Sequence, residues 1–384
     1  REISVERRKT IIKIVLISII SIAIIIISSL YVTDANFRLS IDKIFNRAVY
    51  ENNLKSIEIS SEDNPIVYSY DKYIVVLSKG VLKCYDKTAK NVSSIEVNIT
   101  SPMMKSNEKY LVIGEKGGKN FCVVHNNELL WSGTVEGSIS EININSNGYV
   151  SVIVTNTTYK SVVIAYNNEG IELFKTYINS TYALNCDISN NNRYLAIGEV
   201  DYSGTIIKSK VEIISIDLAK NDPRNSIINT YESEPGEVIT TLNYHIGDNV
   251  YCVFSNYVQK VNHSGNERVV DFNDNTLFAD IYAKNSLVLF EKQSSGIFSS
   301  EYQIKIINLS TKKESLYFED LKLIKSLKAS GENIVLNFVN SVQVLTKKGW
   351  LSKKYTSTKE IKDIVVSEKI VGIVYKDKIE IIEL

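Results

Sequence analysis

The chain combines one long apolar run with many short, regularly repeated ones. Residues Ile14–Val32 are uninterrupted by any charged side chain. As a helix this run would be about 28 Å long, which matches the hydrocarbon thickness of a bilayer. A helix satisfies its own backbone hydrogen bonds, so the run can cross lipid. The sequence therefore predicts a transmembrane helix at 14–32, with the lipid bilayer as its partner.

The charges beside this run predict its orientation. Residues 1–13 carry five basic and two acidic side chains, whereas residues 33–40 carry one of each. Basic flanks stay in the cytoplasm, so we expect a short cytoplasmic tail at 1–13 and an extracytoplasmic remainder. A cleaved signal peptide is the alternative. Its apolar core is usually about 7–15 residues long and precedes a small-residue cleavage site, which Ser28-Ser29-Leu30 matches poorly.

The segment 33–53 links the apolar run to the rest of the chain. Its apolar residues fall at helical spacing, and Ser40 is a suitable N-cap for a helix. We expect a short amphipathic helix that packs on the following domain, binds a partner or lies in the headgroup layer. The residues at this spacing are Phe37, Ile41, Ile44, Phe45 and Ala48.

From Ser56 onward, short runs rich in Val, Ile and Tyr alternate with turns of Asn, Asp, Gly and Ser, which is typical of antiparallel strands. One unit, a strand, a tight polar turn and a second strand that begins with Tyr or an aliphatic residue, recurs eight times. Its second strand begins near residues 73, 110, 149, 194, 250, 286, 334 and 370. Four-stranded repeats of about 40–50 residues are typical of propeller blades.

The sequence therefore predicts an all-β fold, a β-propeller at 54–384. Eight blades are favoured, and seven remain possible if the sixth and weakest copy is degenerate. The chain ends in a third-strand pattern, Asp377–Leu384, with no fourth strand after it. The alternating segment Leu54–Ser60 can supply that strand, so we expect the two ends of the chain to close the ring in one blade.

Two blade endings carry a family resemblance. Asn167–Phe174 and Asn126–Trp131 resemble the D-x-x-G-x-x-x-W ending of quinoprotein-like and YVTN-like bacterial propellers, within the wider WD40-like propellers. The whole layout resembles an uncharacterised clostridial family with one membrane helix and an extracytoplasmic propeller. The resemblance implies the fold and no particular activity. With only two tryptophans, Trp131 and Trp350, the chain lacks most of the residues that mark quinone-binding blades.

Composition and residue spacing limit the partners and kinds of site that we expect. The chain is neutral, and removing residues 1–13 leaves a mildly acidic remainder without a basic stripe, so we expect no nucleic acid partner. No pair of cysteines has a metal-ligand spacing. All four lie in apolar runs that predict reduced core thiols, and disulfide pairing in an exported protein is the alternative. The three histidines, His125, His245 and His263, fall at turns of different units and predict no metal site. We find no catalytic, cofactor or metal motif.

Two segments break the repeat and are the candidates for partner contact, because function concentrates in loops on rigid scaffolds. One is the segment 218–237, and the other is the segment 292–300. A tolerated insertion is the alternative for each. The candidate contact residues are Pro223, Arg224, Glu232, Glu234 and Phe298.

The sequence thus favours a membrane-anchored extracytoplasmic propeller that binds a protein or envelope partner without catalysis. The rival hypothesis is an enzyme, either a glycan hydrolase or a quinoprotein-like oxidoreductase. Carboxylates converging on the central channel would favour the first enzyme, and a ring of tryptophans around a cofactor would favour the second.

Overall fold

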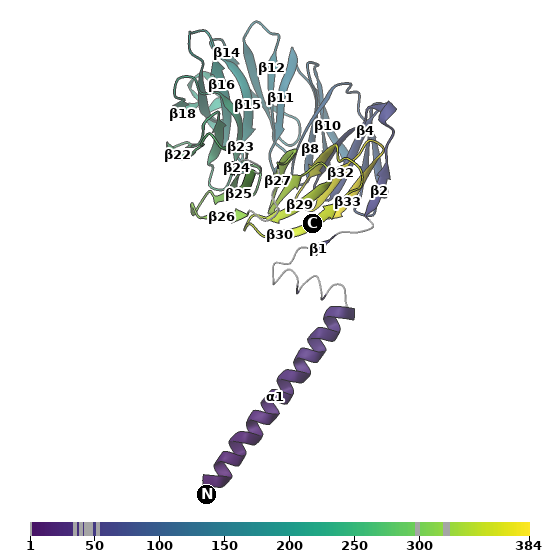
Figure 1. Ribbon diagram of the computed structural model, residues 1–384. Helices are drawn as coiled ribbons and strands as arrows, with labels where there is room; N and C mark the ends of the chain where they lie inside the picture. Colours follow the sequence, from purple (N-terminus) through teal and green to yellow (C-terminus); the bar gives the residue numbers. More distant parts are fainter. Residues whose placement is uncertain are drawn as a thin grey trace.

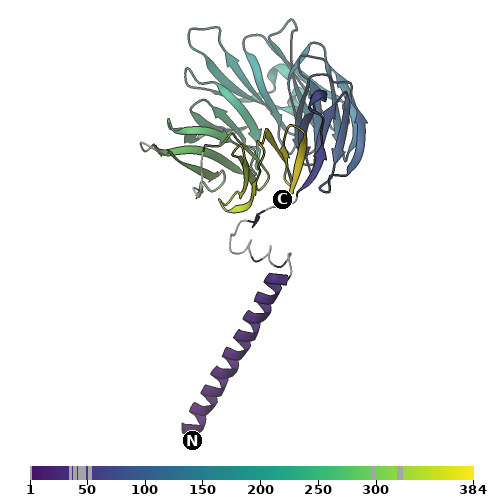
Figure 2. The same ribbon diagram turned by 45° about the vertical axis from the view of Figure 1, so that its right-hand side comes forward.

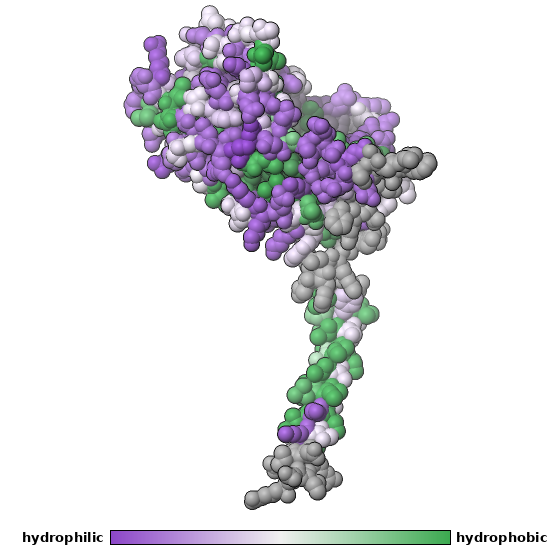
Figure 3. Space-filling model, turned by 60° about the vertical axis from the view of Figure 1, so that its left-hand side comes forward, coloured by the Kyte–Doolittle hydropathy of each residue, from purple (hydrophilic) through white to green (hydrophobic). Residues whose placement is uncertain are grey.

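The computed structural model describes residues 2–33, 37, 41, 49–50, 54–295, 300–317 and 323–384. The chain forms one long helix and a ring of antiparallel sheets (Figures 1 and 2). The helix, α1 (Glu2–Thr33), contains a stretch, Lys9–Thr33, that is long and apolar enough to cross a membrane. Its aliphatic side chains are exposed, Ile25 by 66% for example, and form the hydrophobic surface that Figure 3 shows next to a largely hydrophilic domain. Most of the expected juxtamembrane helix lies outside the described residues.

The ring has eight sheets, which we number as blades 1–8 in chain order. Each blade runs from an innermost first strand to an outermost fourth strand, joined by antiparallel pairing between consecutive strands. The strands of blades 1–4 are β3 (Ile66–Tyr70), β4 (Tyr73–Ser78), β5 (Val81–Tyr85), β6 (Asn91–Glu96); β7 (Pro102–Asn107), β8 (Tyr110–Glu115), β9 (Asn120–His125), β10 (Glu128–Thr134); β11 (Ser138–Ile144), β12 (Val150–Thr155), β13 (Ser161–Tyr166), β14 (Glu172–Ile178); β15 (Tyr182–Ile188), β16 (Tyr194–Asp201), β17 (Lys208–Ser215) and β18 (Ile227–Glu232).

The second half of the ring follows the same plan. Its strands are β19 (Ile239–Tyr244), β20 (Val250–Phe254), β21 (Tyr257–Asn262), β22 (Gly265–Asp271); β23 (Thr276–Asp280), β24 (Ser286–Ser295), β25 (Ser300–Asn308), β26 (Glu314–Tyr317); β27 (Ser326–Ser330), β28 (Asn333–Asn337), β29 (Ser341–Thr346), β30 (Leu351–Thr356); β31 (Asp363–Val366), β32 (Ile370–Val374) and β33 (Lys378–Glu383). Short helices occur at η1 (Ser61–Asp63), α3 (Ile216–Ala219) and η2 (Pro223–Asn225).

The second strands explain why the repeat is visible in the sequence. They lie between two neighbours in their own sheet and between two adjacent blades, so both of their faces are buried and they read as continuous apolar runs. In β12 (Val150–Thr155), the first five side chains are all buried. The eight second strands begin within one residue of the eight predicted positions, including the sixth, so the expectation of eight blades is confirmed.

The hydrophobic core is divided among the contacts between blades. Each pair of neighbouring blades shares a cluster, such as the one that contains Ile153 of blade 3 and Ile197 of blade 4. A blade therefore buries its faces only when both neighbours are in place. All four cysteines are buried and unpaired in these contacts, which agrees with the predicted core thiols.

Both ends of the chain build blade 8, as predicted. Strand β2 (Lys55–Glu58) pairs antiparallel with β33, with Ile57 opposite Ile379. Ile57 is 4% exposed and packs in the cluster shared by blades 8 and 1. Strand β1 (Val49–Tyr50) pairs in parallel with the outer edge of β30 in blade 7. The chain that follows α1 therefore joins the ring at its rim, on the outer edges of blades 7 and 8.

Candidate binding surfaces

The segment 218–237 is not one long loop, as the sequence analysis expected. It contains the end of α3, the helix η2 and the whole of β18, the fourth strand of blade 4. Pro223 and Arg224 lie in the connection before β18, whereas Glu232 and Glu234 lie at and after its end. Six residues of strand extend about 20 Å. The candidate residues therefore occupy opposite ends of one blade and do not form a single contact surface.

The local contacts of these residues differ. Asp222 caps η2 by accepting a hydrogen bond from the backbone N–H of Arg224. Glu234 forms an ion pair with Arg268 of blade 5, whose guanidinium lies over the ring of Tyr257. Glu232 is exposed. Phe298 lies outside the described residues.

The histidines have different environments. His125 stacks on Tyr110, and His263 stacks on Tyr194 at the corresponding turn of another blade. His245 is buried rather than solvated, with Nε2 lying 2.8 Å from the carbonyl oxygen of Ile281. Burial lowers its pKa to about 4. Among the described residues, no group of three or more His, Cys, Asp or Glu side chains is arranged to hold a metal ion.

Tyrosines gather at one end of blades 3 and 4, near the connection between these blades. The rings of Tyr159 and Tyr177 lie 4.6 Å apart, and those of Tyr182 and Tyr202 stack at 4.9 Å. Lys160 directly follows Tyr159 of the first pair, and its Nζ lies 5.0 Å from the centre of the Tyr182 ring of the second pair. Tyr177 and Tyr202 remain 54% and 53% exposed. We call these four tyrosines and Lys160 the tyrosine ledge.

A buried ion cluster supports the tyrosine ledge. Glu199 lies on the strand that leads to Tyr202, is fully buried and accepts a hydrogen bond from the hydroxyl of Thr181, which directly precedes Tyr182. Lys210 lies 3.3 Å from Glu199 and 2.5 Å from Glu212. Burial, followed by the charge of Glu212, raises the pKa of Glu199 to about 7. The other carboxylate oxygen of Glu199 has no partner among the described residues.

The channel side of the ring carries paired charges. Lys105 of β7 lies 3.4 Å from Glu141 of β11, and Lys328 of β27 lies 3.0 Å from Asp363 of β31. These carboxylates are each held by a lysine of the neighbouring blade. Bulges in the innermost strands of blades 3–6 instead expose small or apolar residues, namely Ser140, Leu184, Thr240 and Leu277.

The two tryptophans lie at the outer strands of their blades, Trp131 within β10 and Trp350 in the turn before β30. Trp131 of β10 donates a hydrogen bond to the carbonyl of Asn168 and contacts Phe121 edge to face. Trp350 immediately precedes β30. Neither tryptophan therefore lies in a ring around a central cofactor, which was the feature that would have favoured an oxidoreductase.

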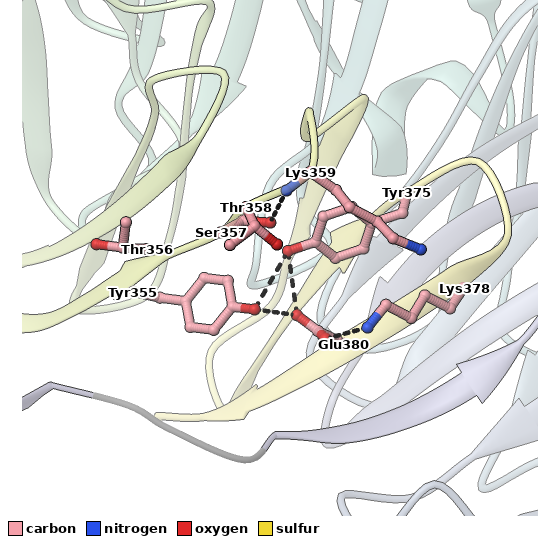
Figure 4. A pocket seen from close by; sticks show the side chains of 8 residues that line it. All are labelled: Tyr355, Thr356, Ser357, Thr358, Lys359, Tyr375, Lys378 and Glu380. Atoms are coloured by element: carbon pink, nitrogen blue, oxygen red, sulfur yellow. Dashed lines mark hydrogen bonds and ion pairs between the residues drawn. The ribbon is translucent and has the colours of Figure 1, made fainter.

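A cavity of about 180 Å³ lies where blades 7 and 8 meet (Figure 4). The hydroxyls of Tyr355 and Tyr375 both donate to Glu380, and the Nζ of Lys378 lies 2.5 Å from the other oxygen of this carboxylate. Burial alone would raise the pKa of Glu380, but hydrogen bonds from Lys378, Tyr355 and Tyr375 outweigh it and lower the pKa. The cavity is smaller than typical ligand sites of about 300–1,000 Å³, and these groups already satisfy one another, so we interpret the network as a structural link.

Comparisons with known proteins agree with this fold. A family model described as a family of unknown function (DUF5711) matches residues 46–384. No curated protein is similar enough in sequence to match. Among solved structures, BamB from Moraxella catarrhalis is 10% identical with a TM-score of 0.52, covering 87% of this chain and 99% of BamB. The C-terminal WD40 domain of Sif2 is 11% identical with a TM-score of 0.57, covering 86% of this chain and 98% of that domain. At these identities, the likeness shows a shared propeller fold.

Proposed function

We propose that this chain, which belongs to the DUF5711 family of unknown function, is a membrane-anchored binding module without catalytic activity. Its propeller lies outside the cytoplasm and captures a protein or cell-envelope partner. The observation that carries this proposal is the tyrosine ledge. Exposed tyrosines give large contact area at low entropic cost and are enriched where proteins bind partners.

The position of the ledge supports the same function. In a ring of eight, blades 3 and 4 lie diametrically opposite blades 7 and 8, where the chain joins from α1. Figure 1 shows β14 and β16 at one side of the ring and β30 and β33 at the other. The ledge therefore occupies the part of the ring farthest from the anchor, where a partner meets no obstruction from the bilayer.

The exposure of α1 supports the anchor. An aliphatic helix that contacts no core needs a non-aqueous environment, since each exposed side chain would gain about 1.5–3 kcal/mol on burial. The basic residues of 1–13 favour a cytoplasmic N-terminus. Protease added to intact cells stripped of their wall should digest the propeller and leave a membrane-protected fragment of α1. Digestion only after lysis would reverse the orientation, and a mature protein without α1 would show that the helix is a cleaved signal.

Partner capture tests the binding role. Full-length protein in native membranes should crosslink to a partner, and Tyr177→Ser with Tyr202→Ser should abolish that crosslink. Loss of one central tyrosine typically costs about 2 kcal/mol, or roughly thirtyfold in affinity. Ile246→Ser is the matched control, because Ile246 is 63% exposed at a turn of blade 5, away from the ledge. Equal crosslinking by both variants would show that the tyrosine ledge is not the binding surface. Turnover of a glycan or an alcohol by the purified protein would favour an enzyme.

A further inference from the structure

The two tryptophans differ in how the ring covers them. Trp131 is half-buried, and Gly170 in the third-to-fourth-strand turn of the next blade lies against it, since an added Cβ there would be 2.8 Å from the indole ring. Trp350 is 43% exposed. Among the described residues, no turn of that kind lies beside Trp350, because the fourth strand of blade 8 is β2 from the other end of the chain. Closure of the ring thus leaves a large aromatic side chain uncovered at the rim.

The surroundings of Trp350 are amphipathic. Its turn reads Lys347-Lys348-Gly349-Trp350, and the Nζ of Lys348 lies 5.1 Å from the centre of the indole. Gly349 brings this turn against the outer strand of blade 6, since an added Cβ would lie 3.4 Å from the carbonyl oxygen of Leu316. The Leu316 side chain is 50% exposed. Indole, lysine and leucine thus gather on adjacent outer edges of blades 6 and 7.

This patch lies beside the point where the chain arrives from α1. Val49 of β1 pairs with Lys353, only three residues after Trp350. Because β1 and β30 are parallel, the first residue of β1 lies toward the first residues of β30, which directly follow Trp350. Fifteen residues separate Thr33 from Val49, and they span at most about 55 Å when fully extended. The membrane surface at the end of α1 is therefore within reach of the rim.

Charge is distributed unevenly across the ring, and the basic residues are in excess on the side where the chain arrives from α1. Residues 323–384 of blades 7 and 8 carry eleven lysines against seven acids, and β2 adds one charge of each sign. Residues 138–232 of blades 3 and 4 carry seven basic against ten acidic side chains. A bilayer surface that contains anionic lipid attracts nearby lysines, so this excess of lysines favours the rim of blades 7 and 8 facing the bilayer.

We propose that the rim formed by Lys348, Trp350 and Leu316 lies in the headgroup layer of the bilayer that α1 spans. The propeller then rests on the membrane by its edge, and the tyrosine ledge points away from it. Trp and Lys suit this position, since the indole is amphipathic and the lysine stem extends along apolar surface while its charge meets the lipid phosphate. The inference rests on the proposed anchor, and it adds a second membrane contact that fixes the orientation of the ring.

Fluorescence quenching in bilayers tests this contact with the full-length chain. Trp131→Phe leaves Trp350 as the sole tryptophan, and Trp350→Phe leaves Trp131 as the matched control. Both variants are reconstituted in nanodiscs of zwitterionic lipid or of zwitterionic lipid with phosphatidylglycerol, with and without lipids brominated near the carbonyl. We expect severalfold stronger quenching of Trp350 than of Trp131, further strengthened by phosphatidylglycerol. Lys348→Glu should weaken the effect of the anionic lipid. If Trp131→Phe fails to fold, the difference between the wild-type and Trp350→Phe emission gives the Trp350 signal.

Three outcomes would overturn the inference. Equal quenching of both tryptophans in properly inserted protein would show that the rim does not touch the bilayer, while the anchor stands. Failure of the chain to remain with the bilayer on flotation would remove the anchor itself, and the proposed function with it. A concentration-dependent blue shift of Trp350 emission in detergent, without quenching in nanodiscs, would assign the patch to a second copy of this chain.

Discussion

The seam between β2 and β33 allows a quantitative test of ring closure. Ile57→Ala removes most of a side chain that is 4% exposed among the aliphatic residues shared by blades 8 and 1. Such substitutions cost about 2–5 kcal/mol, because lost burial and the remaining cavity add together. We expect a loss of about 3 kcal/mol in the free energy of unfolding. That is a large share of the roughly 5–15 kcal/mol that holds a typical domain folded.

The location of the response matters as much as its size. Every blade buries its faces against its neighbours, so opening the seam should weaken the ring as a whole. Cys186 of blade 4 is 2% exposed, lies far from the seam and should react with a thiol reagent only when the ring opens. In Ile57→Ala, its labelling rate should rise about a hundredfold, the factor that corresponds to roughly 3 kcal/mol.

Urea unfolding followed by fluorescence, together with mass spectrometry of labelled cysteines, measures both effects. Glu58→Ala is the matched control, because Glu58 is exposed on the same strand and should change the unfolding free energy by less than about 0.5 kcal/mol. The reasoning fails if Ile57→Ala behaves like this control. It also fails if the substitution lowers stability while the labelling rate of Cys186 stays unchanged, because blade 8 would then open alone.

Three further predictions concern His245, Gly170 and the four cysteines. His245 stays neutral in the folded state down to about pH 4, whereas the unfolded chain takes up its proton near pH 6.5, so its contribution to stability is complete above pH 6.5 and is lost as the pH falls to about 4. The stability difference between wild type and His245→Gln should therefore shrink by about 3 kcal/mol between pH 7 and pH 4 in urea titrations, and a constant difference would contradict the burial of this imidazole. Gly170→Ala would force a φ of +81° on alanine and place its Cβ against the Trp131 ring, so we expect the melting temperature to fall. Gly236→Ala is the control, because its φ of +88° is similar but the space around it is open, and it should lower the melting temperature less. All four cysteines should resist Ellman's reagent in the native protein and react in urea, since each is buried and burial raises the pKa of Cys122 to about 12; rapid labelling of the folded protein would contradict the packing.

The sequence was sufficient for the ring because the repeat is carried by strands buried on both faces. Any polar insertion there would be costly, so even the weak sixth unit keeps Leu287, Val288 and Leu289, all essentially buried. Closure was also predictable, because the final third-strand pattern lacked a partner and Leu54–Ser60 had the required alternation.

The candidate surface was less accessible to such reasoning. Ile227–Glu232 alternates like other fourth strands, but the prolines and glutamates on either side of it are typical of loops and concealed this strand. The tyrosine ledge is assembled by contacts between blades, which spacing along one strand does not encode. One signal was present, since Tyr159, Tyr177, Tyr182 and Tyr202 all fall at strand ends or turns of two adjacent units. Glu199 was another, because a carboxylate within the apolar run Leu195–Val200 indicates a buried charge that needs a partner.

The pairing of β2 with β33 also determines when the ring can close during synthesis of the chain. Ile57 is made 322 residues before its partner Ile379. At roughly 5–20 residues per second, β2 emerges about 16–64 s before β33 exists. During that interval the growing row of blades has two open sheet edges, which can pair with other chains. The nascent chain must therefore avoid pairing with neighbouring chains until the six residues of β33 have been made, because only then can β2 close the ring.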